Sequence, residues 1–356
     1  MSLRSLFLIC ALTFTSAGEA VAAGTGHLSV RGSEIVDPSG RPILLRGWNW
    51  GHFGKAVETD AADNAAQGAN AVRLPLRWWG YYTQKGIDSR DDSATSTGGI
   101  SPVLLKKLDD DIRWASNAHL WIVLFIDSNC GQRGMQNPEN VAYCDPGKQY
   151  RDGHNFWTDP AARARFIQVW RFIANRYKDT PYIGLFEPLP EPGTPTTTPA
   201  QIKDFYNEVM TAIRQVAPGI PFLIGANKYH TALAQSVYEP AWKDVVYTGN
   251  LFYRARGEDG GIPNFHRRLE QLTSLRSKHG VPIFVQQVGV RVGDDPEASS
   301  LKAVLQDLVD NRIGFAYWEY RGSNHPGEYG VLYQQAGQGW KTNQAALAAI
   351  SAAFRR

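Results

Sequence analysis

Short apolar runs alternate with longer amphipathic stretches along most of the chain. Brief apolar runs are typical of buried strands, whereas apolar residues at three- and four-residue spacing are typical of helices. The stretches at 161–177 and 200–216 predict two such helices, and Thr198-Pro199 is a typical helix start for the second. The apolar runs predict eight strands, at 44–48, 71–75, 121–127, 182–186, 222–225, 245–248, 282–285 and 314–318.

Eight strand-then-helix units without a linker-like stretch predict an α/β fold, a single closed (β/α)8 TIM barrel rather than two domains. Residues 27–43 have the pattern of a small N-terminal β-hairpin, which we expect to close the bottom of the barrel. The loops that follow barrel strands carry the chemistry of such folds, so the Pro- and Thr-rich segment 194–198 is a candidate functional loop. We place this one domain at residues 24–356.

Residues 1–22 have the order of a signal peptide: the charged Arg4, the apolar run 6–12, and then the small residues of 20–22. We therefore expect a secreted or periplasmic protein. The apolar run is too short to span a bilayer, and Cys10 lacks the small-residue context of a lipid-anchored cysteine, so we expect no membrane anchor.

Cys130 and Cys144 are the two cysteines left after residues 1–22, within a loop rich in Gly, Asn and Pro. In an oxidising compartment such a pair predicts a disulfide, worth about 3 kcal/mol in the chain-entropy model. Two free thiols or a metal pair are weaker alternatives, because no cluster of His and Cys nearby supplies further ligands.

The charges exclude one class of partner and the aromatic residues favour another. The net charge of +3 is spread without a basic run, which argues against nucleic acid. The 11 Trp and 15 Tyr suit stacking on sugar rings and favour a carbohydrate ligand. The eight His show no metal-binding spacing, so a metal-dependent hydrolase is the least favoured class and we expect no cofactor. We also expect a monomer. His52 and His325 follow the first and last predicted strands and are candidates to line the site.

The segment from Phe172 to Glu187, continued by Glu191-Pro192, resembles the part of glycoside hydrolase family 5, a cellulase-type family of clan A, that leads to its Asn-Glu-Pro acid/base motif. Residues 45–49, 72–75 and 316–318 resemble the first, second and eighth strands of that family. The resemblance covers nearly all of the chain after residue 22. It implies a barrel that acts on a polysaccharide or oligosaccharide by hydrolysis of O-glycosyl bonds.

Family 5 chemistry needs two carboxylates, one to protonate the leaving oxygen and one to attack the anomeric carbon. The resemblance places Glu191 at the acid/base position; the alternative is an ordinary loop glutamate that caps the next helix. The nucleophile of the family lies in a Pro-x-x-x-Gly-Glu-x-Gly pattern, and between Pro282 and Gly289 this chain has Gln287 in the place of the glutamate. An amide can bind a sugar hydroxyl but cannot become an anionic nucleophile, so we expect double displacement to be severely impaired.

Other positions depart from the family together. The third-strand His falls on Asp127, the Asn before the acid/base falls on Pro190, and the His-x-Tyr of the sixth strand falls on Asn250-Leu251-Phe252. Arg73 and Trp318 keep the residue types of the family, which implies support of the nucleophile site by Arg73 and stacking on the sugar by Trp318.

Two functions follow, and the sequence alone does not separate them. In the first, the protein is a glycoside hydrolase with a different second carboxylate, for which Asp127 is the best candidate and Glu319 and Glu187 are weaker ones. Asp127 could equally be a buried carboxylate paired with Arg73 or another cation. In the second, the protein is a catalytically inactive carbohydrate-binding pseudoenzyme. Its stacking candidates are Trp50, Trp78, Trp79 and Trp318, although each tryptophan alone is more often a core residue.

Overall fold

The computed structural model describes residues 26–51, 53–78, 100–127, 157, 160–193, 197–226, 234–253, 261–322, 328–335 and 339–356. Several sequence-based expectations lie outside these ranges. They are the signal peptide 1–22, the disulfide between Cys130 and Cys144, and the sites suggested for His52, Trp79 and His325.

Parallel strands form one continuous barrel sheet in the order β8-β7-β6-β5-β4-β3-β11-β10-β9. β8 and β9 are successive parts of one barrel strand, because β8 pairs with β7 whereas β9 pairs with β10. A bridge between Tyr247 and Ile283 completes the circle. The prediction of eight barrel strands is therefore confirmed. The strands are β3 (Arg46–Asn49), β4 (Ala71–Arg77), β5 (Trp121–Asp127), β6 (Ile183–Glu187), β7 (Phe222–Ile224), β8 (Val245–Tyr247), β9 (Asn250–Tyr253), β10 (Phe284–Val290) and β11 (Gly314–Tyr317).

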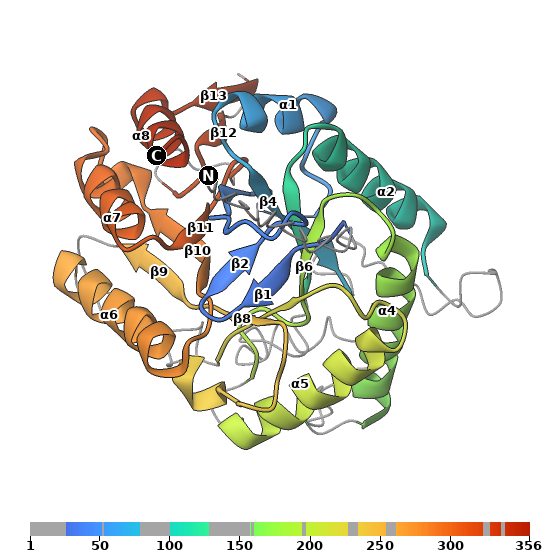
Figure 1. Cartoon of the computed structure of the whole chain (residues 1–356). Helices are drawn as coiled ribbons and strands as arrows, with labels where there is room; N and C mark the ends of the chain where they lie inside the picture. The colour runs from blue at the N-terminus through green and yellow to red at the C-terminus, as the bar shows by residue number, and fades with distance from the viewer. Residues whose placement is uncertain are drawn as a thin grey trace, which may run out of the picture.

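Helices surround the sheet as an outer ring (Figure 1). The two helices predicted from periodicity are α4 and α5, and Thr198 caps α5 in a capping box with Gln201. The described helices are α1 (Glu58–Ala66), α2 (Pro102–Asn117), α4 (Pro160–Tyr177), α5 (Pro199–Arg214), α6 (Gly261–His279), α7 (Ser299–Asp310) and α8 (Gln344–Phe354), with short 3-10 turns η2 (Ala234–Val237) and η3 (Val292–Asp294). None of the helices in these ranges is long and apolar enough to cross a membrane.

The N-terminal hairpin, β1 (Ser29–Arg31) and β2 (Glu34–Val36), lies over the centre of the ring (Figure 1). Leu28 and Ile35 of this segment pack in one buried cluster with apolar side chains that come from, or directly precede, each of the eight barrel strands. This confirms that the hairpin closes the bottom of the barrel. A second hairpin, β12 (Leu332–Gln335) and β13 (Gly339–Thr342), follows β11. The barrel side chains in the cluster are Leu45, Ala71, Trp121, Val123, Leu185, Leu223, Val246, Phe284 and Ala316.

Candidate active site

A mainly polar layer of inward-facing side chains lies next to the apolar cluster that contains Leu28 and Ile35, farther along the barrel strands. Side chains of a strand alternate between its two faces, so the residue two positions after an inward apolar residue also faces inward. On five strands this residue is Arg73, Phe125, Glu187, Thr248 or Gln286, each two positions beyond a member of the apolar cluster. The layer lies toward the carboxyl-terminal ends of the barrel strands, where barrel enzymes have their active sites.

Arg73 is the centre of the layer and is completely buried. Its Nε and Nη2 donate to the two oxygens of Glu187 at 2.6 and 3.0 Å, which is a bidentate ion pair. Nη1 donates to Asn49 Oδ1 at 2.9 Å and Nη2 also to Gln286 Oε1 at 3.1 Å. The guanidinium carbon lies 3.6 Å from the ring centre of Phe125. Glu187, a weaker candidate for the second carboxylate, is therefore held in an ion pair in which its charge balances that of Arg73.

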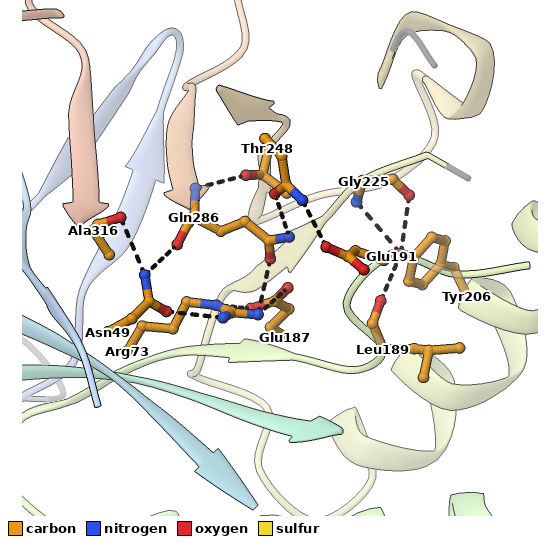
Figure 2. Close-up of polar contacts among 11 residues, drawn as sticks. Asn49, Arg73, Glu187, Leu189, Glu191, Tyr206, Gly225, Thr248, Gln286 and Ala316 are labelled. Carbon is orange, nitrogen blue, oxygen red and sulfur yellow. Dashed lines mark hydrogen bonds and ion pairs between the residues drawn. The ribbon is translucent and has the colours of Figure 1, made fainter. Parts of the chain in front are cut away.

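Asn49 binds the neighbouring strands to this centre. Its Nδ2 donates to the carbonyl oxygens of Gln286 at 2.8 Å and Ala316 at 3.1 Å (Figure 2). Because its Oδ1 accepts from Arg73, one side chain connects β4, β10 and β11 to the end of β3. Such buried amides fix the strand ends relative to one another, since each lost bond would leave a buried polar group unpaired.

Glu191 lies in the turn that follows β6 and is buried, with a positive φ of 49°. Two helices hold the preceding residues. Trp170 of α4 donates its Nε1 to the Pro188 carbonyl at 2.8 Å, and the hydroxyl of Tyr206 of α5 contacts the carbonyls of Leu189 at 3.3 Å and Gly225 at 3.0 Å. Figure 2 shows Tyr206 between these two carbonyls. The turn that places Glu191 is thus fixed by helix side chains, not by the strand alone.

A chain of amides connects Arg73 to Glu191. Gln286 accepts from Arg73 and donates its Nε2 to Asn250 Oδ1 at 3.0 Å. Asn250, also buried, donates its Nδ2 to Glu191 Oε1 at 2.7 Å. Thr248 Oγ1 accepts from the backbone N–H of Gln286 at 3.0 Å, which fixes the backbone of β10 at this point. Asn250, one of the positions that depart from the family pattern, therefore contacts the candidate acid directly.

Gln286 and Gln287 lie at an irregularity in the pairing of β10 with β11. Val285 pairs with Phe315 and Val288 with Tyr317, so β10 has one more residue than β11 over this stretch. Val285 and Val288 both pack in the core outside the barrel, and the two glutamines lie between them. Gln287 is level with Asn250 in the pairing with β9 and is largely buried.

Asp127 is the last residue of β5 and pairs in register with Arg77 of β4. β5 is the neighbour of β6, so Asp127 and Glu191 come from adjacent strands at the same end of the barrel. The side chain of Asp127 lies outside the described part of the structure. Its role as the second carboxylate stays a prediction.

The tryptophan candidates differ in their surroundings. Trp50 is buried and donates its Nε1 to Asn64 of α1 at 2.9 Å, and Trp78 is buried against the ring of Phe166 at 4.9 Å. Both are core residues in this structure, and stacking on a sugar would require either ring to leave the core. Trp318, directly after β11, is partly exposed.

Phe252 is partly exposed and packs edge-on against Tyr329, with ring centres 5.1 Å apart. Both rings lie over Gly289 of β10, where a Cβ would come within 2.8 Å of Phe252 and 2.9 Å of Tyr329. A glycine at this position therefore lets two aromatic rings close over the end of β10, one residue beyond Val288.

Glu319 follows Trp318 and is buried beside the backbone of Gly51. Its Oε2 has no hydrogen-bond partner among the described residues, and burial raises the pKa of this carboxyl to about 7, although Lys55 opposes the shift. It does not take part in the hydrogen bonds around Arg73 and Glu191. The described residues contain no group of three or more His, Cys, Asp or Glu side chains that could hold a metal ion.

A closed (β/α)8 barrel with a buried glutamate beyond its fourth barrel strand defines a class of proteins that includes many glycosidases. The model of the cellulase family, glycosyl hydrolase family 5, matches residues 36–324. The chain therefore belongs to glycosyl hydrolase family 5.

One curated relative is the probable glucan 1,3-beta-glucosidase A of Aspergillus fumigatus, 28% identical over 171 residues, which are 47% of this chain and 36% of the relative. The chain spans about half or less of the length of the curated relatives that it matches. Among solved structures, an endogalactoceramidase superposes with a TM-score of 0.69 at 18% identity, covering 91% of this chain and 84% of the other. A Glu→Gln variant of the catalytic domain of Thermobifida fusca endoglucanase Cel5A, in complex with cellotetraose, superposes with a TM-score of 0.62 at 17% identity, covering 92% and 96%.

Sequence reasoning missed three residues that hold the site. Gln286 was visible as a departure, because the family pattern has glycine there, but the bulge that brings it to Arg73 leaves no mark in the sequence. Trp170 and Tyr206 bind backbone carbonyls, and the apolar periodicity of α4 and α5 does not distinguish them from other core residues.

Proposed function

We propose that this protein is an exported family 5 barrel that binds a polysaccharide or oligosaccharide at the carboxyl ends of its strands and does not perform double displacement. The observation that carries the proposal is the pair of glutamines on β10. Gln286 takes the hydrogen bonds of Arg73 and Asn250, and Gln287 takes the place of the nucleophile. Neither amide can attack an anomeric carbon, whereas both can bind hydroxyl groups.

The positions of Glu187 and Glu319 support this proposal. Glu187 is held by Arg73 and Glu319 is buried away from the amide chain, so neither replaces a nucleophile beside Glu191. The Glu→Gln variant of Thermobifida fusca endoglucanase Cel5A in complex with cellotetraose illustrates that a barrel of this fold can hold a glycan when a glutamate has become a glutamine. A Glu→Gln replacement in a barrel of this fold is therefore compatible with glycan binding.

A second candidate function is hydrolysis in a single displacement, with Glu191 as the acid and Asp127 as the base that activates a water. The position of Asp127 at the end of β5, the strand next to β6, favours it over other carboxylates. This route requires the two carboxyl groups to be about 6.5–9.5 Å apart.

Binding is tested by affinity electrophoresis of the purified protein in β-glucans, mannans, xylans and bacterial exopolysaccharides. We expect retardation in at least one glycan, and a roughly tenfold loss of affinity in Trp318→Ala, because stacking on this partly exposed ring would be lost. Trp340→Ala is the matched control, since this exposed tryptophan lies on the β12–β13 hairpin. Absence of retardation in every glycan would refute the proposal.

The second candidate is tested on the same glycans by release of reducing sugar. Glu191→Gln should leave glycan affinity roughly intact, because an amide keeps the shape of the carboxylate. If the wild-type protein releases sugar, the removal of a general acid should lower the rate by about 10²- to 10⁴-fold in Glu191→Gln, and Asp127→Asn should be similarly impaired. Unchanged turnover in Glu191→Gln would contradict the acid/base assignment.

A further inference from the structure

A cavity of about 240 Å³ lies at the opposite end of the barrel from Glu191. Its walls are the N-terminal hairpin, the amino ends of β10 and β11, and the segments that follow α6 and α7. Leu44, Pro282 and Gly314 line it, and each precedes or begins a barrel strand. The polar layer lies farther along the same strands. This cavity is therefore separate from the proposed glycan site.

Two arginines line the cavity, Arg276 near the end of α6 and Arg312 just after α7. Neither forms an ion pair with a carboxylate in the described part of the chain. Glu34, the one acidic side chain of the lining, is directed to Arg31 at 3.7 Å. Asn311 and Ser33 add neutral polar groups to the same walls. The lining thus has an excess of positive charge.

The guanidinium groups at this end of the barrel repel one another. Burial and then the charge of Arg312 lower the pKa of Arg276, and the same two causes in the same order lower the pKa of Arg46. Arg46 is buried at the start of β3, and its Nε has no hydrogen-bond partner within the part of the chain that the structure describes. A bound anion would relieve this repulsion at the half-buried Arg276, because an opposite charge favours the charged form of a guanidinium group.

Helix capping accounts for only part of the arrangement. Arg276 donates its Nη1 to the carbonyls of Asn311 at 2.9 Å and Arg312 at 3.3 Å, the usual role of a cation at a helix C-terminus. That role uses one nitrogen of Arg276 and does not involve the side chain of Arg312. Arg276 is half-buried and Arg312 is exposed, and the other donors of both side chains have no protein acceptor in the described part of the chain, so they are available to a ligand in the cavity.

We propose that the cavity binds a small oxyanion, a phosphate or carboxylate group, between Arg276 and Arg312. Its volume decides the size of the ligand. Pockets for drug-sized ligands occupy about 300–1,000 Å³, so this smaller cavity accepts a phosphate group or a single acidic sugar but not an oligosaccharide. The oxyanion site is independent of the proposed glycan site.

The test is calorimetric titration of the full-length protein with inorganic phosphate and with glucuronate at constant ionic strength. Arg312→Asn removes one guanidinium, and asparagine tolerates the positive φ of 52° at this position. Arg276→Gln is a second variant, and Lys278→Gln is the matched control because this exposed lysine near the end of α6 does not line the cavity. Thermal unfolding in chloride confirms that each variant is folded.

We expect saturable binding of at least one anion by the wild-type protein and the Lys278 variant. Both arginine variants should bind it roughly tenfold more weakly or worse, since each loses charge-assisted hydrogen bonds. Tighter binding of phosphate would assign the site to a phosphoryl group, and tighter binding of glucuronate would assign it to an acidic sugar. No saturable binding of either anion, or equal affinity in Arg312→Asn, would overturn the proposal.

Discussion

β6 and β10 contribute to the same polar layer, but they bring different chemistry to it. β6 and its turn supply two carboxylates, Glu187 bound to Arg73 and Glu191 bound to Asn250. β10 supplies two amides, and Gln286 contacts Arg73 and Asn250 at the same time. Both strands therefore supply hydrogen-bonding side chains. The layer holds one cation, Arg73, and two carboxylates, Glu187 and Glu191, whereas a glutamate at the nucleophile position would add a third.

β6 and β10 also differ in the buried charge that they bring to the layer. A buried charge is tolerated only when it is paired and hydrogen-bonded, and Arg73 is already neutralised by the bidentate contact with Glu187. A carboxylate at position 286 or 287 would add a second negative charge beside Glu191, as a retaining glycosidase requires. Under the proposed function, the glutamines avoid this repulsion and leave β10 without a nucleophile. A polar and well-ordered layer is thus no sign of catalysis by itself.

The largest expected effect comes from breaking the pair on the β6 side. Arg73→Met leaves the charge of Glu187 buried and unpaired, so we expect the free energy of unfolding to fall by about 3–5 kcal/mol in urea titrations. The control is Arg31→Met, which removes the exposed partner of Glu34 and should cost less than about 1 kcal/mol. Similar losses in both variants would mean that the Arg73–Glu187 pair does not hold the layer together.

A second effect concerns Glu319, a buried carboxylate whose Oε2 lacks a hydrogen-bond partner in the described ranges. Its folded-state pKa is raised to about 7 from 4.5, so the folded protein favours the protonated form. The stability it contributes is complete below pH 4.5 and is lost as pH rises through about 7, and about 2–3 kcal/mol of this loss falls between pH 5 and pH 8. In Glu319→Gln this loss should disappear, which urea unfolding at pH 5 and pH 8 would reveal. Equal pH dependence in both proteins would contradict the buried, neutral state of Glu319.

A smaller effect tests how the turn before Glu191 is held. Tyr206→Phe removes the hydroxyl that contacts the carbonyls of Leu189 and Gly225, and should cost about 1–2 kcal/mol of stability and weaken glycan binding. Tyr317→Phe is the matched control, because its buried hydroxyl donates to the Val290 carbonyl away from this turn. We expect a similar loss of stability there, with glycan affinity unchanged. Equal affinities in the two variants would show that Tyr206 does not position the site.

The sequence predicted the barrel well because its alternation of apolar runs and amphipathic stretches survives along most of the chain. The helices predicted at 161–177 and 200–216 are Pro160–Tyr177 and Pro199–Arg214. The predicted strand bounds are wrong where polar residues occur within a strand. The strand predicted at 282–285 is β10, Phe284–Val290, since the apolar run is interrupted by Gln286-Gln287 at the point where the strand joins the polar layer. The apolar pattern missed β9 because this strand begins with the polar Asn250, although the family resemblance placed residues 250–252 on the sixth strand.

The same limit applies to the site. Glu191, Arg73 and Asn250 could be named from the resemblance, and the structure connects Glu191 and Asn250 directly and Arg73 to both through Gln286. The part played by Gln286 depends on a one-residue irregularity in the pairing of β10 and β11, which is a property of the folded sheet and not of the local sequence. Trp50 and Trp78 were candidates because of their residue type, but burial depends on neighbours that are distant along the chain.

The central claim, that β10 lacks the nucleophile and its surroundings, is tested most directly by reducing-sugar release on a glycan that the protein binds. Wild-type protein and Gln287→Glu should be compared side by side. We predict no release by the wild-type protein and little by the variant, because Gln286 still occupies Arg73 and Asn250, and Asp127 and Pro190 still differ from the family. Glu191-dependent release by the wild-type protein, or efficient turnover by Gln287→Glu alone, would contradict the account.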